Sequence, residues 1–187
     1  MRHSHERRAT ALAESDRLAL ILEAVRYCQR AKALGMPPSC YTKALREPIY
    51  FLWECRDGLS KQCRPQFRSR ESLGVRFGSG TLVYDHAIPF RYLQEDLLAL
   101  EDPTEHSVAE GLNRYGVIVL ITKDEDRRVS KAGYNSRMPQ GWDGVDPFAR
   151  YKAVGIEVLP NPEHVGGSAK NKVSRRLPCL DSLSTKC

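Results

Sequence analysis

The chain has 187 residues, of which 41% are hydrophobic and 28% are charged. This composition is typical of a soluble globular protein with enough chain to bury a core of its own. No apolar run approaches the roughly 20 residues that a membrane-spanning helix needs, and no secretory signal is visible, so we expect a cytoplasmic protein without a membrane partner.

The net charge of +6 is unevenly distributed along the chain. Residues 1–80 hold 15 Lys and Arg against 8 Asp and Glu, residues 81–165 hold 9 against 14, and residues 166–187 hold 5 against 1. Basic segments on either side favour binding to a polyanion, because the neutralisation of phosphates supplies most of the affinity for nucleic acid. A carboxylate-rich segment between them favours binding of cations. The alternative is a solvated surface without a partner.

Residues 1–80 are predicted to form a basic helical region. An apolar residue recurs every three or four positions between residues 10 and 34, as expected for a helix with one buried face. These apolar residues are Leu18, Ile21, Leu22, Val25 and Cys28. A second helix is predicted after Ser39, which can cap it, and Pro48 should kink or divide that helix.

Residues 56–80 are polar, basic and interrupted by glycines, so we expect a loop-rich connection. The arginines of this segment are candidates for contacts with phosphate groups, although solvated loop side chains are the simpler interpretation. These arginines are Arg64, Arg68, Arg70 and Arg76.

Residues 81–160 are predicted to form a mixed α and β domain. A short strand over residues 81–84 ends at Asp85 and His86, and the β-branched run at 117–121 predicts a second, buried strand. Two helices are expected between them, over residues 90–100 and 104–115. Thr122 and Glu125 form a predicted capping box, so another helix should begin at Lys123.

The end of the chain is predicted to contain a helix, a strand and a tail. A helix is expected from Asp146 to Val154, followed by a strand over residues 156–159. Trp142, in the loop between the predicted helices, is expected to anchor that loop on the protein's own core. Residues 161–187 are rich in Gly, Ser and Lys and are predicted to be a basic, flexible tail.

Two segments resemble a known family of nucleases. The sequence VYDHAIP at residues 83–89 resembles the first half of the HNH, or ββα-metal, nuclease motif, in which a strand delivers an acid, a histidine and then a proline. The sequence VLITKDEDR at residues 119–127 is similar to the strand-to-helix segment of the HNH domain in RNA-guided CRISPR effector nucleases. The resemblance covers residues 81–135. It implies an α+β fold with a ββα-metal core, a helical insert and an α-helical N-terminal region.

By position, the resemblance implies that Asp85 and Asp126 are metal ligands, that Asp124 is a supporting carboxylate and that His86 is the general base. It departs from the family at Asp126, where Asn or His is usual, and in its long helical insert. Carboxylate ligands favour Mg²⁺ or Mn²⁺. Because neighbours on a regular strand point to opposite faces, such a site requires the strand to bend or end at Asp85 and His86.

The sequence therefore predicts a metal-dependent endonuclease that hydrolyses phosphodiester bonds in DNA, with duplex DNA as the expected partner. Arg127, Arg128 and Lys131 are expected to hold DNA phosphates, or else to be solvated residues on a helix face. One alternative is a catalytically degenerate HNH-fold module that binds DNA or protein. Another is a helical interaction protein in which the Asp-His pair is coincidental. A homodimer is compatible with the function, since paired sites cut both strands symmetrically.

Overall fold

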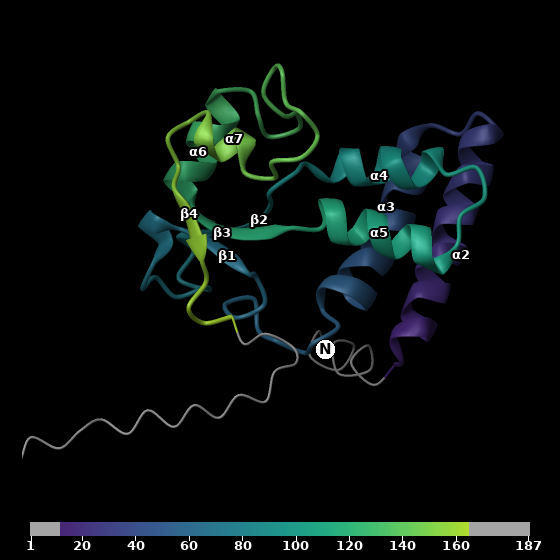
Figure 1. The fold of residues 1–187 in the computed structure, drawn as a ribbon, viewed down its shortest axis with the longest axis horizontal. Coiled ribbons are helices and arrows are strands. Elements are labelled where there is room, and N and C mark those ends of the chain that lie inside the picture. The colour runs from purple at the N-terminus through teal and green to yellow at the C-terminus, as the bar shows by residue number, and fades with distance from the viewer. Residues whose placement is uncertain (1–11, 165–187) are drawn as a thin grey trace, which may run out of the picture.

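Figure 1 shows the computed structural model of the chain, which describes residues 12–164. Four helices lie together on one side of the molecule, and a four-stranded sheet with two further helices lies on the other (Figure 1). The four grouped helices are α2 (Glu14–Ala33), α3 (Pro38–Pro48), α4 (Phe90–Ala99) and α5 (Glu105–Tyr115). The fold is therefore α+β, as predicted. No helix within residues 12–164 has both the length and the apolar character needed to cross a membrane.

The four helices share one hydrophobic core. The predicted apolar face of α2 is buried, and Ile21, Val25 and Cys28 are fully enclosed. These side chains pack against apolar residues of α4 and α5, including Leu97 and Val108. The helices between the two predicted strands thus pack with the N-terminal helices, and this core crosses the boundary predicted at residue 80.

The second helix differs from the prediction at its first turn. Pro37 is its N-cap and Pro38 its first residue, so Ser39 lies inside the helix and does not cap it. Pro48 is the last residue of α3 and divides the helical path, as predicted. Because proline lacks an amide hydrogen and crowds the preceding turn, the α-helix changes there into the wider π-helix η1 (Ile49–Glu54). This change places Trp53 and Glu54 in buried positions.

The sheet has the strand order β2-β3-β1-β4. β2 (Leu82–His86) runs antiparallel to β3 (Ile118–Thr122), which runs parallel to β1 (Phe67–Ser69), and β4 (Val158–Pro160) is antiparallel to β1. β1 and the short 3-10 helix η2 (Arg70–Ser72) lie in the segment predicted to be loop-rich. The region predicted to be helical, residues 1–80, therefore also supplies one strand of the sheet.

The helix after β3 was predicted correctly. α6 (Lys123–Lys131) begins with the expected capping box: the Thr122 hydroxyl accepts from the Glu125 amide at 3.2 Å, and the Glu125 carboxylate accepts from the Thr122 amide at 2.7 Å. Val129 of α6 packs on the sheet. α7 (Ala149–Lys152) is shorter than the helix predicted up to Val154, and β4 begins two residues later than predicted.

The start of the predicted tail is anchored to the sheet. Asn161 is buried, and its side-chain amide donates to the carbonyl groups of Gln62 and Pro65 at 3.0 and 2.8 Å. Glu163 accepts a hydrogen bond from Arg68 at 3.0 Å. The remainder of the predicted tail, residues 165–187, lies outside the described residues.

Leu97→Ala should destabilise the protein by about 2–5 kcal/mol, because it removes buried methyl groups and leaves a cavity where α4 meets the N-terminal helices. Chemical denaturation followed by circular dichroism measures the change. Val145→Ala is the control, since 77% of Val145 is exposed and little change is expected. Equal effects of the two substitutions would contradict a shared core.

Candidate functional site

Successive side chains of β2 point to opposite faces of the sheet, and this separates Asp85 from His86. His86 points toward Glu54 of η1, whereas Asp85 points toward Arg150 of α7. Pairing with β3 continues through His86. Beyond it, the amide of Ala87 still donates to the carbonyl group of Val117, just before β3, at 2.8 Å. The bend that an HNH-like site requires is not found here, so the structure does not bring Asp85 and His86 into one site.

His86 forms a polar cluster with Glu54 and Tyr84. Nε2 of His86 lies 2.9 Å from Oε1 of Glu54, and the Tyr84 hydroxyl donates to Oε2 of Glu54 at 3.1 Å. Only 14% of the His86 side chain and 5% of the Glu54 side chain are exposed. Because a carboxylate can only accept, Nε2 of His86 carries the hydrogen in this contact.

The surroundings of Glu54 favour its ionised form. Burial raises the pKa of Glu54, but the hydrogen bond and charge of His86, the Tyr84 hydroxyl and the charge of Arg64 together lower this pKa by more. Burial, followed by the charge of Glu54, raises the pKa of Tyr84 well above its ordinary value. At neutral pH the cluster therefore contains a carboxylate that accepts hydrogen bonds and a phenol that donates one.

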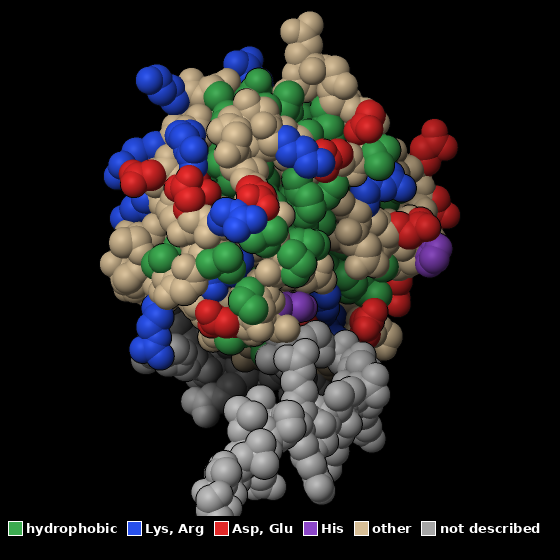
Figure 2. Space-filling view, turned by 60° about the vertical axis from the view of Figure 1, so that its left-hand side comes forward, with side chains coloured by type: hydrophobic (Ala, Val, Ile, Leu, Met, Phe, Trp, Pro, Cys, Tyr) green, Lys and Arg blue, Asp and Glu red, His purple; other side chains and the backbone are tan. Residues whose placement is uncertain are grey.

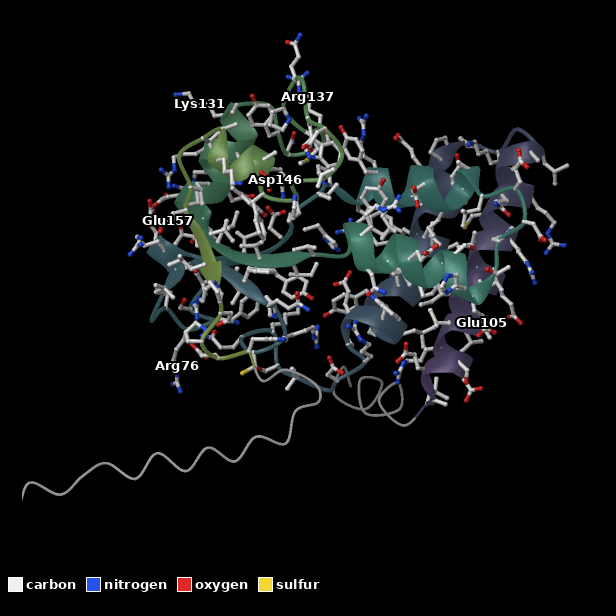
Figure 3. All side chains as sticks on the ribbon, viewed as in Figure 1. Arg76, Glu105, Lys131, Arg137, Asp146 and Glu157 are labelled. Carbon is white, nitrogen blue, oxygen red and sulfur yellow. The ribbon has the colours of Figure 1, made fainter. Side chains whose placement is uncertain are left out.

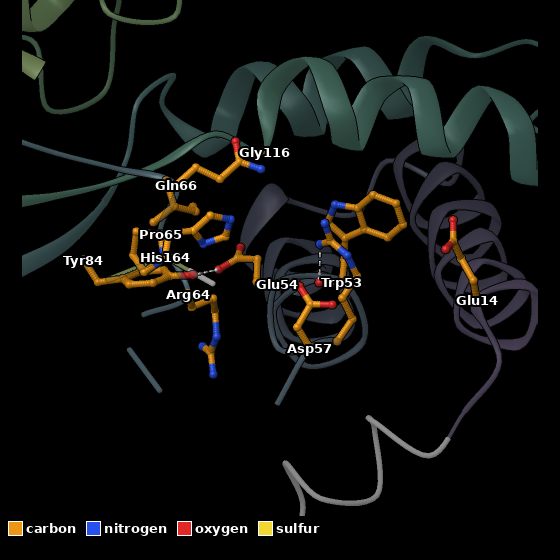
Figure 4. Close-up of a pocket in the computed structure, with 12 residues that line it drawn as sticks. Glu14, Trp53, Glu54, Asp57, Arg64, Pro65, Gln66, Tyr84, Gly116 and His164 are labelled. Atoms are coloured by element: carbon orange, nitrogen blue, oxygen red, sulfur yellow. Dashed lines mark hydrogen bonds between the residues drawn. The ribbon is translucent and has the colours of Figure 1, made fainter. Parts of the chain in front are cut away.

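Glu54 and Tyr84 also line a polar pocket of about 430 Å³, which Figure 4 shows in close-up. Arg64 lines the same pocket and is only 8% exposed. Its Nη2 donates to the Leu59 carbonyl at 2.9 Å, whereas Nε and Nη1 have no hydrogen-bond partner of good geometry among the described residues. The pocket thus combines a buried cation with the carboxylate that holds His86.

The opposite face of β2 holds Asp85 in a buried ion pair. Arg150 is 2% exposed and donates to the Asp85 carboxylate and to the carbonyl groups of Ala87 and Tyr134, the last two at 2.8 and 2.9 Å. The Tyr151 hydroxyl donates to Asp85 at 2.8 Å. Burial raises the pKa of Asp85, and Arg150 and Tyr151 lower it by less. Asp85 therefore links the end of β2 to α7.

The acidic residues at the start of α6 have different surroundings. Asp126 is half-buried and close enough to Asp85 for its charge to raise the pKa of that carboxyl. Asp124 is exposed and pairs with Arg127 of the same helix. The buried carboxylate of this turn is Glu125, which also accepts a hydrogen bond from Ser69 of β1. Of the two acids predicted on α6, only Asp126 lies near Asp85.

These carboxylates do not fit the predicted Mg²⁺ or Mn²⁺ site. Within residues 12–164, no three His, Cys, Asp or Glu side chains are grouped closely enough to hold a metal ion. Asp126 lies close enough to Asp85 to affect its pKa, but the guanidinium of Arg150 already donates to the Asp85 carboxylate. A divalent cation beside Asp85 would meet this fixed positive charge, and His86 lies on the other face.

The predicted phosphate contacts on α6 are exposed and partly paired. Arg127 pairs with Asp124, and Arg128 lies 2.7 Å from Glu71. Lys131 extends into solvent from the end of α6 (Figure 3). In Figure 2, Lys and Arg side chains lie among Asp and Glu side chains over the visible face instead of forming an unbroken basic patch.

The arginines predicted from residues 56–80 do not share one surface. Arg64 and Arg68 are buried, and Arg68 is held by Glu163, Ser72 and the Val75 carbonyl. Arg70 is exposed and pairs with Glu157. Arg76 is exposed at the end of the sheet-bearing side opposite Lys131 (Figure 3). Arg68 thus has a structural role and no free surface for a phosphate.

Sequence reasoning did not identify Glu54, Tyr84 or Arg150. Tyr84 carried a usable signal, because it lies two residues before His86 and so shares its face of a strand. Glu54 and Arg150 carried none, since each meets β2 across a long separation in sequence. Trp142 matches its prediction: its indole donates to the Asp146 carbonyl at 2.8 Å and its ring packs edge-on against Tyr92.

Comparisons with known proteins do not connect this site to a family. No family model matches the chain, and neither a curated protein nor a solved structure was found to be similar to it.

Arg150→Met should lower the free energy of unfolding by about 3–5 kcal/mol, because it leaves the buried Asp85 carboxylate without its cation. Adding Asp85→Asn should recover part of that loss, as measured by denaturant unfolding of the single and double variants. Arg127→Met, in an exposed ion pair, serves as the control and should change little. An Arg150→Met protein as stable as the wild type would contradict this assignment.

Glu54 should contribute to the pH dependence of stability. Its pKa is lowered in the folded protein, so its contribution is fully present above its ordinary pKa of 4.5 and is lost as the pH falls through the folded value. Denaturant unfolding of wild type and Glu54→Gln between neutral and acid pH tests this. The stability difference between the two proteins should shrink in acid, and a constant difference would contradict the assignment.

Proposed function

We propose that this protein is an endonuclease that hydrolyses phosphodiester bonds in DNA, with His86 as its general base. The observation that carries the proposal is the hydrogen bond between His86 and the ionised, buried Glu54, which lines a polar pocket. A buried carboxylate that holds one ring nitrogen orients a histidine for proton transfer at the other. The arrangement of β2, β3 and α6 also supports an HNH-like unit, because two antiparallel strands are followed directly by a helix that contacts both.

The chemistry follows from the orientation of the ring. Because Nε2 of His86 donates to Glu54, the neutral ring has its lone pair on Nδ1, which can take a proton from water. The water oxygen bonds to phosphorus, the bond to the 3′ oxygen breaks, and that oxygen takes a proton from solvent. Glu54 stabilises the resulting imidazolium. General base catalysis of this kind accelerates a reaction by about 10²–10⁴-fold.

Arg64 would assist by its charge. Its guanidinium lies in the wall of the pocket that Glu54 lines, where a buried cation stabilises the negative charge that develops on a phosphate in the transition state. The exposed Arg127, Arg128 and Lys131 would contribute to the binding of the DNA backbone. No step of the mechanism passes through a metal ion, because Asp85 and Asp126 do not fit a metal site in this arrangement.

A binding module is the second candidate. The ion pair of Asp85 with Arg150 favours it, since a carboxylate that would hold the metal ion in an active HNH nuclease is here engaged in a structural contact. In that case the protein would bind DNA, or another protein, without cleaving a phosphodiester bond.

Cleavage of supercoiled plasmid tests the proposal, at low salt so that phosphate contacts are not screened. Wild type should nick the plasmid, His86→Ala should reduce the rate by about 10²-fold or more, and Glu54→Gln should reduce it by a smaller factor. His106→Ala is the matched control, because His106 is an exposed histidine on α5 whose side chain is 85% exposed, and it should cleave at the wild-type rate.

Parallel reactions with Mg²⁺, Mn²⁺ and EDTA test the metal dependence predicted from the sequence. Loss of cleavage in EDTA would show that the reaction needs a divalent ion and would overturn the mechanism without a metal. Plasmid binding without cleavage under every condition would support the binding module, and cleavage that survives His86→Ala would overturn the role of His86.

A further inference from the structure

The outer face of α2 carries an exposed apolar stripe. Leu20, Tyr27 and Leu34 are 45%, 51% and 82% exposed. Leu20 and Tyr27 lie within α2 and Leu34 is its C-cap residue. The three are spaced seven residues apart, so they line up along one side of the helix, opposite the buried face formed by Ile21 and Val25. Exposed apolar residues scattered singly on a surface are common, but a row with this spacing is typical of a helix that pairs with another helix.

The neighbours of the stripe suit close packing. Ala24 and Ala31 lie beside it and are only half-buried by the four-helix core. Small side chains at these positions allow a second helix to approach, while Tyr27 supplies a large aromatic ring at the centre. The stripe thus has the bulky centre and small flanks of a helix-pairing surface.

The charges beside the stripe select its partner. The exposed charged residues of the first half of α2 are Glu14, Asp16 and Glu23, because Arg17 is buried, and the second half carries Arg26, Arg30 and Lys32. A helix whose charge changes sign along its length is complementary to a second copy of itself that runs in the opposite direction. A parallel copy would instead place like charges together.

We infer that two copies of this chain pair through α2, antiparallel and centred on Tyr27, to form a symmetric dimer. In this arrangement Leu20 and Leu34 of opposite copies meet, because each lies seven residues, or about 10.5 Å, from Tyr27. Glu23 of one copy and Arg30 of the other differ by about 1.5 Å along the helix axis, so they can form an ion pair. Twofold symmetry forms each of these contacts twice.

Sedimentation of the full chain over a range of concentrations tests the dimer, without substrate and therefore independently of the proposed nuclease activity. Wild type should form a dimer, and Tyr27→Glu should weaken it by at least about tenfold in Kd. Val145→Glu is the matched control, because it places the same charge at an exposed apolar residue elsewhere and should leave the dimer intact.

A charge exchange tests the direction of pairing. Glu23→Arg should weaken the dimer, and the double variant Glu23→Arg with Arg30→Glu should restore it, since only antiparallel pairing sets residue 23 against residue 30. Circular dichroism would establish that each variant is folded. A wild type that remains monomeric at about 100 µM, a dimer that tolerates Tyr27→Glu, or a double variant that is not restored would each overturn the inference.

Discussion

The alternation of side chains along β2 is the constraint on which the site depends. Pairing with β3 keeps the strand regular through His86, so Tyr84 and His86 face η1 while Asp85 faces α7. The two polar clusters therefore lie on opposite faces of the same strand. Each cluster is built around a carboxylate that is mostly or fully buried and has hydrogen-bond partners, because an unpaired buried charge would be strongly destabilising.

These two clusters join distant parts of the chain. Glu54 contacts β2 from the π-helix that follows Pro48, and a wider turn of this kind often occurs at functional sites. Arg150 reaches β2 from the short helix α7 and also holds the carbonyl groups of Ala87 and Tyr134. The first cluster connects the helical side of the molecule to the sheet, and the second connects the sheet to α7.

The helical side provides both a wall of the site and an outer surface. η1 continues directly from α3 and carries Glu54, while α2 packs behind it in the same core. The apolar stripe of α2 lies on the far side of that helix, away from its buried face. Glu14, the first residue of α2, lines the pocket beside Glu54, so a dimer formed through this stripe would place two such pockets in one particle, each with one end of an α2 helix in its wall.

The sequence by itself determined the elements whose signals are local. The apolar spacing of α2, the β-branched run of β3 and the capping box of Thr122 and Glu125 each act within a few residues, and each was predicted. Only the tertiary structure decided that the polar segment around Arg68 contains a strand, and that Glu54 and Arg150 partner His86 and Asp85. These contacts join residues 32 to 65 positions apart or depend on a neighbouring strand, and no short-range pattern in a single sequence specifies such pairings.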